Sequence, residues 1–91
     1  TEVLFDNDSS AQYTIIEVRA ADRPGLLYQI TGAMQRGRLD IKRAFITTEA
    51  YGVADAFYVT DLEYNKIYDP VRQREIKAKI LEALSGPGIY G

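Results

Sequence analysis

The stretch from Ala20 to Leu27, Ala-Ala-Asp-Arg-Pro-Gly-Leu-Leu, constrains the fold most, because one periodicity ends there and another begins. Residues 12–20 before it alternate between two faces, one more apolar than the other, as a strand packed on a core does. The apolar residues after it recur at the spacing of one helical face: Leu26, Leu27, Ile30, Ala33 and Met34. We therefore predict a strand-to-helix turn in which Pro24 is the first helical residue and Asp22 can accept from the free amides.

The same turn is a candidate site for a small anion. Amides in the first turn of a helix lie at the positive end of the helix dipole, which suits a carboxylate. Gly25 has no side chain, so a ligand or another backbone can approach closely. A turn that only caps the helix needs the same residues. The sequence leaves two roles open for Asp22, a ligand contact and a helix cap.

The remaining segments repeat this alternation of strand and helix patterns. Strand patterns cover residues 2–6, 39–48 and 53–60, and a second helix covers residues 69–85. Asp69 and Pro70 read as the cap and first residue of that helix. The predicted order is strand, strand, helix, strand, strand, helix.

Two residues in the later strands conflict with simple alternation. Ile41, Ala44 and Ile46 look like core residues, but positions 41 and 44 differ in parity, so we expect a bulge near Lys42 and Arg43. Asp55 falls on the core face of its strand and needs a partner there. We expect a structural pairing of Asp55 with a Thr or Arg across the hairpin.

Composition excludes several classes of function. The chain has neither cysteine nor histidine, so it lacks thiol and imidazole nucleophiles and the usual zinc ligands. We expect no catalytic residue, no metal and no cofactor. A net charge of -2 argues against nucleic-acid binding, which depends on Lys and Arg. The apolar runs are shorter than the ~20 residues that span a bilayer, so we expect no membrane partner and a cytoplasmic location.

Residues Tyr13 to Asp61 carry an ordered set of motifs: Asp22-Arg23-Pro24-Gly25-Leu26-Leu27 after a strand, then Leu39-Asp40-Ile41, Ala44, Ile46 and Thr48, and last Asp55-Ala56-Phe57-Tyr58-Val59-Thr60-Asp61. In this order the chain resembles an ACT domain, an α+β ferredoxin-like sandwich in which two helices cover one face of a four-stranded antiparallel sheet. With Phe5-Asp6-Asn7 upstream, it is most similar to the C-terminal ACT domains of bifunctional uridylyltransferase/uridylyl-removing enzymes, which modify the nitrogen-signalling protein PII. We expect residues 1–91 to be a single ACT domain cut from such a longer enzyme, whose catalytic centres lie in other domains.

The resemblance also implies a function and a site. An ACT domain senses a small amino acid, here expected to be glutamine, and regulates an attached enzyme. The ligand would lie between Asp22, Arg23, Pro24, Gly25, Leu26 and Leu27 of one module and Asp40 and Ile41 of a partner module. Its carboxylate would meet the amides of residues 25–27, and its ammonium group would meet Asp22 or carbonyls of the partner strand. The partner would be a second copy in a homodimer or a tandem ACT module.

Three alternatives compete with this interpretation. An ACT module can assemble without binding a ligand. The aromatic run from Tyr51 to Val59 faintly resembles a strand of an RNA-binding domain, although the acidic charge balance opposes that function. A small acyl-phosphate hydrolase can adopt the same fold, but no pair of nucleophile and base is visible.

The chain termini predict a departure from the usual ACT topology. An ordinary ACT domain is βαββαβ, and its last strand pairs beside its first. Residues 86–91 are too rich in Gly and Pro to form that strand, so we expect an irregular tail there. Residues 1–8 are tied by a short turn to the following strand and can take the vacant edge position. We predict a permuted ββαββα order, with residues 39–48 at the opposite, exposed edge.

Overall fold

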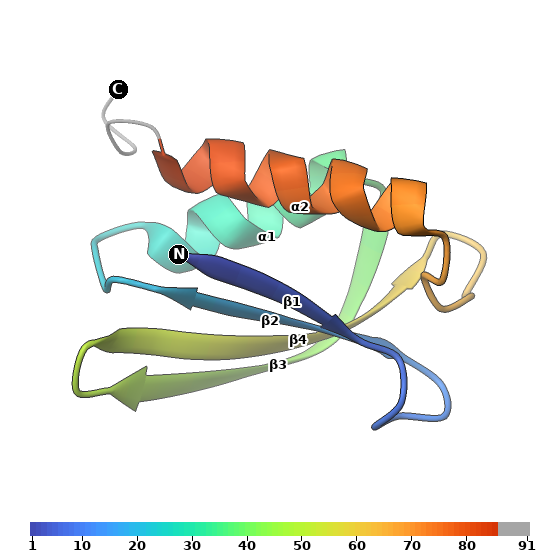
Figure 1. Ribbon diagram of the computed structural model, residues 1–91, viewed down its shortest axis with the longest axis horizontal. Helices are drawn as coiled ribbons and strands as arrows, with labels where there is room; N and C mark the ends of the chain where they lie inside the picture. The colour runs from blue at the N-terminus through green and yellow to red at the C-terminus, as the bar shows by residue number, and fades with distance from the viewer. Residues whose placement is uncertain (86–91) are drawn as a thin grey trace.

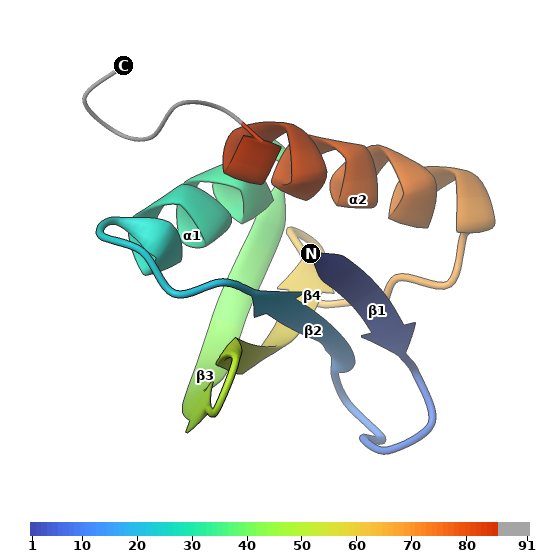
Figure 2. The ribbon, with the colours of Figure 1, turned by 60° about the vertical axis from the view of Figure 1, so that its left-hand side comes forward.

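A computed structural model describes residues 1–85 as one antiparallel sheet covered on one face by two helices (Figures 1 and 2). The elements are β1 (Glu2–Asp6), β2 (Thr14–Ala20), α1 (Leu26–Arg36), β3 (Leu39–Glu49), β4 (Gly52–Asp61) and α2 (Pro70–Ser85). The four strands lie in the order β1-β2-β4-β3. This arrangement confirms the predicted α+β ferredoxin-like fold and its permuted ββαββα order. The irregular tail predicted for residues 86–91 lies outside the described residues, and the domain bounds 1–91 stay a prediction.

β1 takes the edge position beside β2, where an ordinary ACT domain has its last strand. The two strands pair antiparallel from Glu2 opposite Arg19 to Asp6 opposite Ile15. Val3 is 3% exposed and belongs to the core, and Phe5 packs against that core. α2 contacts β1 from above, so the N-terminal strand closes the core beneath the second helix.

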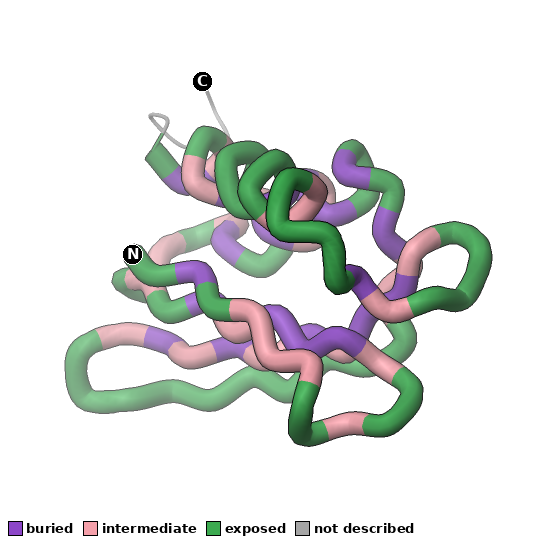
Figure 3. The backbone as a smooth tube through the Cα atoms, turned by 45° about the vertical axis from the view of Figure 1, so that its right-hand side comes forward, coloured by how far each residue is buried: buried purple, intermediate pink, exposed green. Residues whose placement is uncertain are grey.

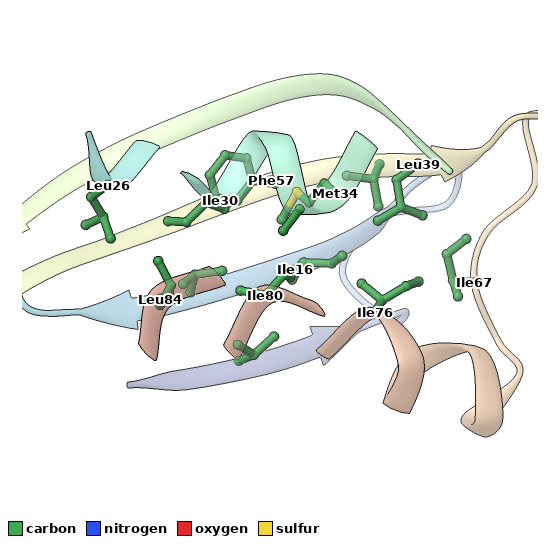
Figure 4. Close-up of a cluster of buried hydrophobic side chains, with 14 of the residues drawn as sticks. Ile16, Leu26, Ile30, Met34, Leu39, Phe57, Ile67, Ile76, Ile80 and Leu84 are labelled. Carbon is green, nitrogen blue, oxygen red and sulfur yellow. The ribbon is translucent and has the colours of Figure 1, made fainter. Parts of the chain in front are cut away.

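The core lies between the helices and the inner face of the sheet (Figure 4). Its fully buried large apolar residues come from β2, β4 and both helices: Ile16, Val18, Phe57, Val59, Ile30, Met34, Ile76 and Ile80. Leu27 departs from the predicted helical stripe, because its side chain is 46% exposed. α1 therefore directs Leu27 away from the core, beside the turn that precedes the helix.

β3 forms the second edge of the sheet and carries the predicted bulge. The pairing of β3 with β4 shifts register between Ile41 and Arg43, which reconciles Ile41 and Ala44 with one face. Beyond the bulge the helices no longer cover the strand, and residues 42–49 are exposed (Figure 3). Phe45 and Ile46 are 48% and 51% exposed, and Ala44 is exposed as well, so the prediction that Ala44 and Ile46 belong to the core is wrong. The edge predicted to be exposed is thus both unpaired and partly apolar.

A group of polar contacts ties the first hairpin to the segment before α2. The side chain of Asn7 donates to the carbonyl of Ile67 at 2.8 Å, and the amide of Ile67 donates to the Thr14 hydroxyl at 2.7 Å. The ammonium group of Lys66 donates to the carbonyls of Asn7 and Ser10 at 2.7 and 2.6 Å. These contacts hold β1 and β2 against a segment more than fifty residues away.

Neither helix within residues 1–85 combines the length and apolar character needed to cross a membrane.

Candidate functional site

The turn between β2 and α1 is a type II β-turn that leads directly into the helix. The amide of Leu26 donates to the carbonyl of Arg23 at 3.2 Å. Gly25 has φ 78° and ψ 5°, the values expected of the third residue of such a turn, and Pro24 occupies the second position, where its fixed φ fits. The positive φ of Gly25 explains why a glycine stands here, independently of any ligand.

This geometry corrects the predicted start of the helix. α1 begins at Leu26 rather than at Pro24, Gly25 is its N-terminal flanking residue, and no side chain caps it. Pro24 satisfies the second position of a type II turn as well as the first position of a helix, because both require φ near -65°. The prediction that Asp22 caps the helix is therefore wrong.

The carboxylate of Asp22 is consequently available to accept a hydrogen bond from a group other than the helix amides. Its side chain is exposed, and within residues 1–85 it forms no hydrogen bond or ion pair. A carboxylate occupied by backbone amides has little capacity left for a ligand, whereas an unoccupied one keeps both oxygens available. Of the two roles open for Asp22, the structure removes the helix cap.

The first turn of α1 presents backbone amides with no partner. The first N–H groups of a helix have no acceptor within the helix, and in the described part of the chain none is found for the amides of Leu27 and Tyr28. The amide of Leu26 is already used by the Arg23 carbonyl. Of the amides of residues 25–27 predicted from the sequence, Leu26 is thus occupied, whereas within residues 1–85 no acceptor is found for those of Gly25 and Leu27, and Tyr28 adds a further free donor.

Arg23 folds back over the helix. Its Nη2 donates to Oε1 of Gln29 at 2.8 Å, and the side chain is half-buried. Its Nε is buried and has no hydrogen-bond partner. Arg23 is thus neither fully solvated nor paired with a carboxylate.

Asp55 is a residue of this region that the sequence predicted as purely structural. It lies on the inner face of β4 and is only 2% exposed, yet within residues 1–85 its Oδ1 has no hydrogen-bond partner. Burial raises the pKa of the Asp55 carboxyl, the negative charge of Asp22 raises it further, and a hydrogen bond from the backbone amide of Thr47 opposes the rise. Within residues 1–85 no Thr or Arg side chain pairs with Asp55, so the structural pairing expected from the sequence is not formed.

The backbone brings Asp55 close to the start of the turn. Ala20, the last residue of β2, pairs with Val53, and Asp55 follows two residues later on the same face of β4. The end of β2 passes close to the start of β4. A Cβ added to Gly52 would lie 2.3 Å from the Ala20 carbonyl oxygen and 3.3 Å from the Cα of Ala21. Asp22 is the next residue, so two carboxylates lie at the base of the turn.

Asp40 and Ile41 lie at the other end of β3, away from the turn. Asp40 pairs with Thr60, whereas Ala20 pairs with Val53, so the two positions are separated by roughly 23 Å along β4. Asp40 also forms an ion pair with Lys42 at 2.7 Å. Within one chain, then, the structure brings together residues 22–27 but does not bring Asp40 and Ile41 to them.

No group of three or more carboxylates within residues 1–85 is close enough to hold a metal ion. The chemistry of the turn is that of hydrogen bonding and charge: two free amides at a helix N-terminus face solvent near two carboxylates. Such a set complements a small zwitterion, which carries one negative and one positive end.

Comparison with known proteins gives one family match and several similar relatives. The profile of the family described as "ACR9-like, ACT-like domain" matches residues 2–88. Three similar curated proteins carry the name bifunctional uridylyltransferase/uridylyl-removing enzyme. They come from Gluconobacter oxydans (43% identical over 83 residues), Bradyrhizobium diazoefficiens (42% over 85) and Rhodopseudomonas palustris (44% over 84).

These matches span nearly all of this chain but a small part of each relative. They cover 91%, 93% and 92% of the chain, in the same order, and 9% of the relative in each case. No solved structure matches the chain significantly.

Proposed function

Because the chain belongs to the ACT-like domain family, a family of regulatory modules, we propose that it senses a free amino acid for a larger uridylyltransferase/uridylyl-removing enzyme. We take L-glutamine as the first ligand to test. The relatives that share 42% to 44% of its residues support that choice of parent enzyme.

The observation that carries the proposal is the unoccupied chemistry of the β2–α1 turn. The amides of Leu27 and Tyr28 have no acceptor in the described chain, and the carboxylate of Asp22 has no donor. A ligand carboxylate can accept from the amides at the positive end of α1, and a ligand ammonium group can approach Asp22. An α-amino acid carries both groups on one carbon.

A second module completes the proposed site. β3 is an exposed edge, and its twin can pair with it antiparallel across a two-fold axis. In that arrangement the Asp40 end of the partner strand lies beside the Glu49 end of this one, at the same end of the sheet as the turn that follows Ala20. Asp40 and Ile41 would then contribute from the partner, which reconciles the predicted site with their separation in one chain. Closing the two modules on a ligand would couple binding to assembly by about 1–3 kcal/mol.

Calorimetry with the purified chain tests the proposal. L-Glutamine should bind in a panel of amino acids, and Asp22→Asn should weaken that binding because one charge-assisted contact is lost. Asp8→Asn is the matched control, since Asp8 is an exposed aspartate in the first hairpin turn. Binding that is equal in all three proteins would remove Asp22 from the site, and no binding of any amino acid would refute the proposed function.

The exposed β3 edge also favours the second candidate, an ACT module that assembles without a ligand. Phe45 and Ile46 offer half-exposed apolar side chains to a partner strand. Sedimentation with and without L-glutamine separates the two functions. Ligand-dependent assembly supports sensing, whereas a dimer that is indifferent to every amino acid in the panel supports assembly alone.

A further inference from the structure

We propose that Asp55 is a binding residue of the amino-acid site, accepting a hydrogen bond through its free Oδ1 from the α-ammonium group of the ligand. This inference rests on the proposed function and names a contact that the turn itself does not contain. It makes the site selective for ligands that carry an ammonium group, as opposed to carboxylic acids of the same shape.

The described part of the chain leaves this oxygen without a donor. Buried carboxylates are normally paired or hydrogen-bonded, because leaving one unsatisfied destabilises the folded protein. Asp55 is 2% exposed and its Oδ1 has no partner. Asp55 also forms no ion pair with a lysine or arginine in the part of the chain that the structure describes. If position 55 contributed only to stability, an apolar side chain there would stabilise the fold more than an aspartate does.

Asp55 also lies close to the turn between β2 and α1. It follows Val53, which pairs with the last residue of β2, and the chain continues from there into Asp22. Asp22 is close enough for its charge to act on Asp55. An ammonium group held between these two carboxylates would be attracted by both. The amides of Leu27 and Tyr28 at the N-terminus of α1 remain available for the carboxylate of the same ligand.

The neighbours of Asp55 on the two sides of β4 differ in exposure. In the register of the sheet Asp55 lies opposite Val18 on one side and Ile46 on the other. Val18 is fully buried, whereas Ile46 is 51% exposed, so the covered region ends at Asp55. Asp55 therefore borders the exposed part of the sheet and is not flanked on both sides by buried residues.

A cycle of protein and ligand changes tests the inference. The ligands are L-glutamine and glutaramic acid, which has the same chain without the α-ammonium group. Calorimetry should show that the unmodified protein binds glutaramic acid roughly 10- to 100-fold more weakly than L-glutamine. Asp55→Asn should weaken the binding of L-glutamine by a similar factor and leave the affinity for glutaramic acid within about twofold, because the negative charge that it removes acts on an ammonium group that glutaramic acid lacks. Asp8→Asn should behave like the unmodified protein.

The outcomes separate this inference from the proposed function. If L-glutamine binds the unmodified protein and Asp55→Asn equally well, the role of Asp55 is refuted while the amino-acid site stands. If the unmodified protein binds no amino acid, both are refuted. Should Asp55→Asn fail to fold, carbon NMR of the Asp55 carboxyl in the unmodified protein decides. Its signal should move when L-glutamine is added and stay in place with glutaramic acid, and an unmoved signal in both titrations refutes the contact.

Discussion

Asn7 and Thr14, at the two ends of the first hairpin loop, are joined side chain to side chain, and both also bond the backbone of Ile67. The Thr14 hydroxyl donates to Oδ1 of Asn7, and the side-chain Nδ2 of Asn7 donates to the Ile67 carbonyl. The backbone amide of Ile67 in turn donates to the Thr14 hydroxyl. The three residues form a closed ring of hydrogen bonds around the fully buried hydroxyl of Thr14. The edge position of β1 therefore depends on polar contacts as well as on apolar packing.

Replacing Thr14 by valine should lower the free energy of unfolding by about 2–3 kcal/mol. The two side chains have nearly the same shape, but valine leaves the buried amide of Ile67 without an acceptor. Thr31→Val is the control, because the Thr31 hydroxyl bonds only carbonyls of its own helix. Urea denaturation measures both variants, and equal losses would show that the ring contributes nothing specific.

Removing residues 1–8 should unfold or aggregate the domain. The deletion exposes the backbone edge of β2, removes Val3 from the core and takes away Asn7 from the ring around Thr14. Circular dichroism and sedimentation of the truncated chain measure the effect. Removal of the exposed Thr1 alone should change nothing. A truncated domain that melts at the temperature of the intact one would contradict the assigned place of β1.

Two glycines should respond to alanine in opposite directions. Gly52 has φ 148°, and a Cβ there would lie 2.3 Å from the Ala20 carbonyl oxygen, so Gly52→Ala should destabilise the protein by about 2 kcal/mol or more. Gly32 lies inside α1, where a Cβ would meet only the flexible end of Arg36 at 3.4 Å. Gly32→Ala should stabilise by about 0.5–1 kcal/mol through helix propensity. Urea denaturation decides both signs.

The raised pKa of Asp55 predicts a pH dependence of stability. Since burial and Asp22 hold this pKa above its usual value, the folded protein binds the Asp55 proton more tightly than the unfolded chain does. The stabilisation that comes from this proton is complete below the pKa of Asp55 in the unfolded chain. It is lost as pH rises through the pKa of Asp55 in the folded protein. Asp55→Asn cannot ionise, so its stability should exceed that of the unmodified protein at neutral pH.

The measurement is the free energy of unfolding of both proteins from about pH 3 to about pH 8. The advantage of Asp55→Asn should shrink toward acid pH, where Asp55 is protonated. The lowered pKa of Asp6, caused first by its hydrogen bond from Ser9, acts in the opposite direction but is common to both proteins. A difference in unfolding free energy between the two proteins that stays constant across this pH range would contradict the raised pKa of Asp55. A variant that is more stable and yet binds L-glutamine more weakly would mark Asp55 as a residue kept for binding.

The fold could be predicted from the sequence because periodicity and turn chemistry agree along most of the chain. The parity of Ile41 and Ala44 located the bulge, and Asp69-Pro70 located the start of α2, where the Val71 amide donates to Oδ1 of Asp69 at 3.0 Å. At Asp22 the same reasoning was wrong. Arg23 intervenes between the aspartate and the proline, and the glycine that follows the proline favours a type II turn over a helical first turn.

The site was predicted only in part, for physical reasons. The motif located the turn, but which of its amides remain free depends on the Arg23 carbonyl, and that contact follows from the turn type. The signal for Asp55 was present, as an aspartate at a core position between Val53 and Phe57. The sequence could not show that Oδ1 of Asp55 lacks a partner within residues 1–85, because it does not show which acceptor Arg23 bonds. In this part of the structure Arg23 bonds Gln29 and leaves that oxygen without a donor.

The contacts around Ile67 also bear on the order in which the chain folds. β3 and β4 are joined by a tight turn and can form early, whereas the bonds from Asn7 and Thr14 to Ile67 close loops of 60 and 53 residues. Ordering so long a loop costs entropy before any contact forms, so this closure belongs to the late steps of folding. The Ile67 amide is therefore a suitable probe of this closure. Its hydrogen exchange should report how often the N-terminal hairpin detaches from an otherwise intact domain.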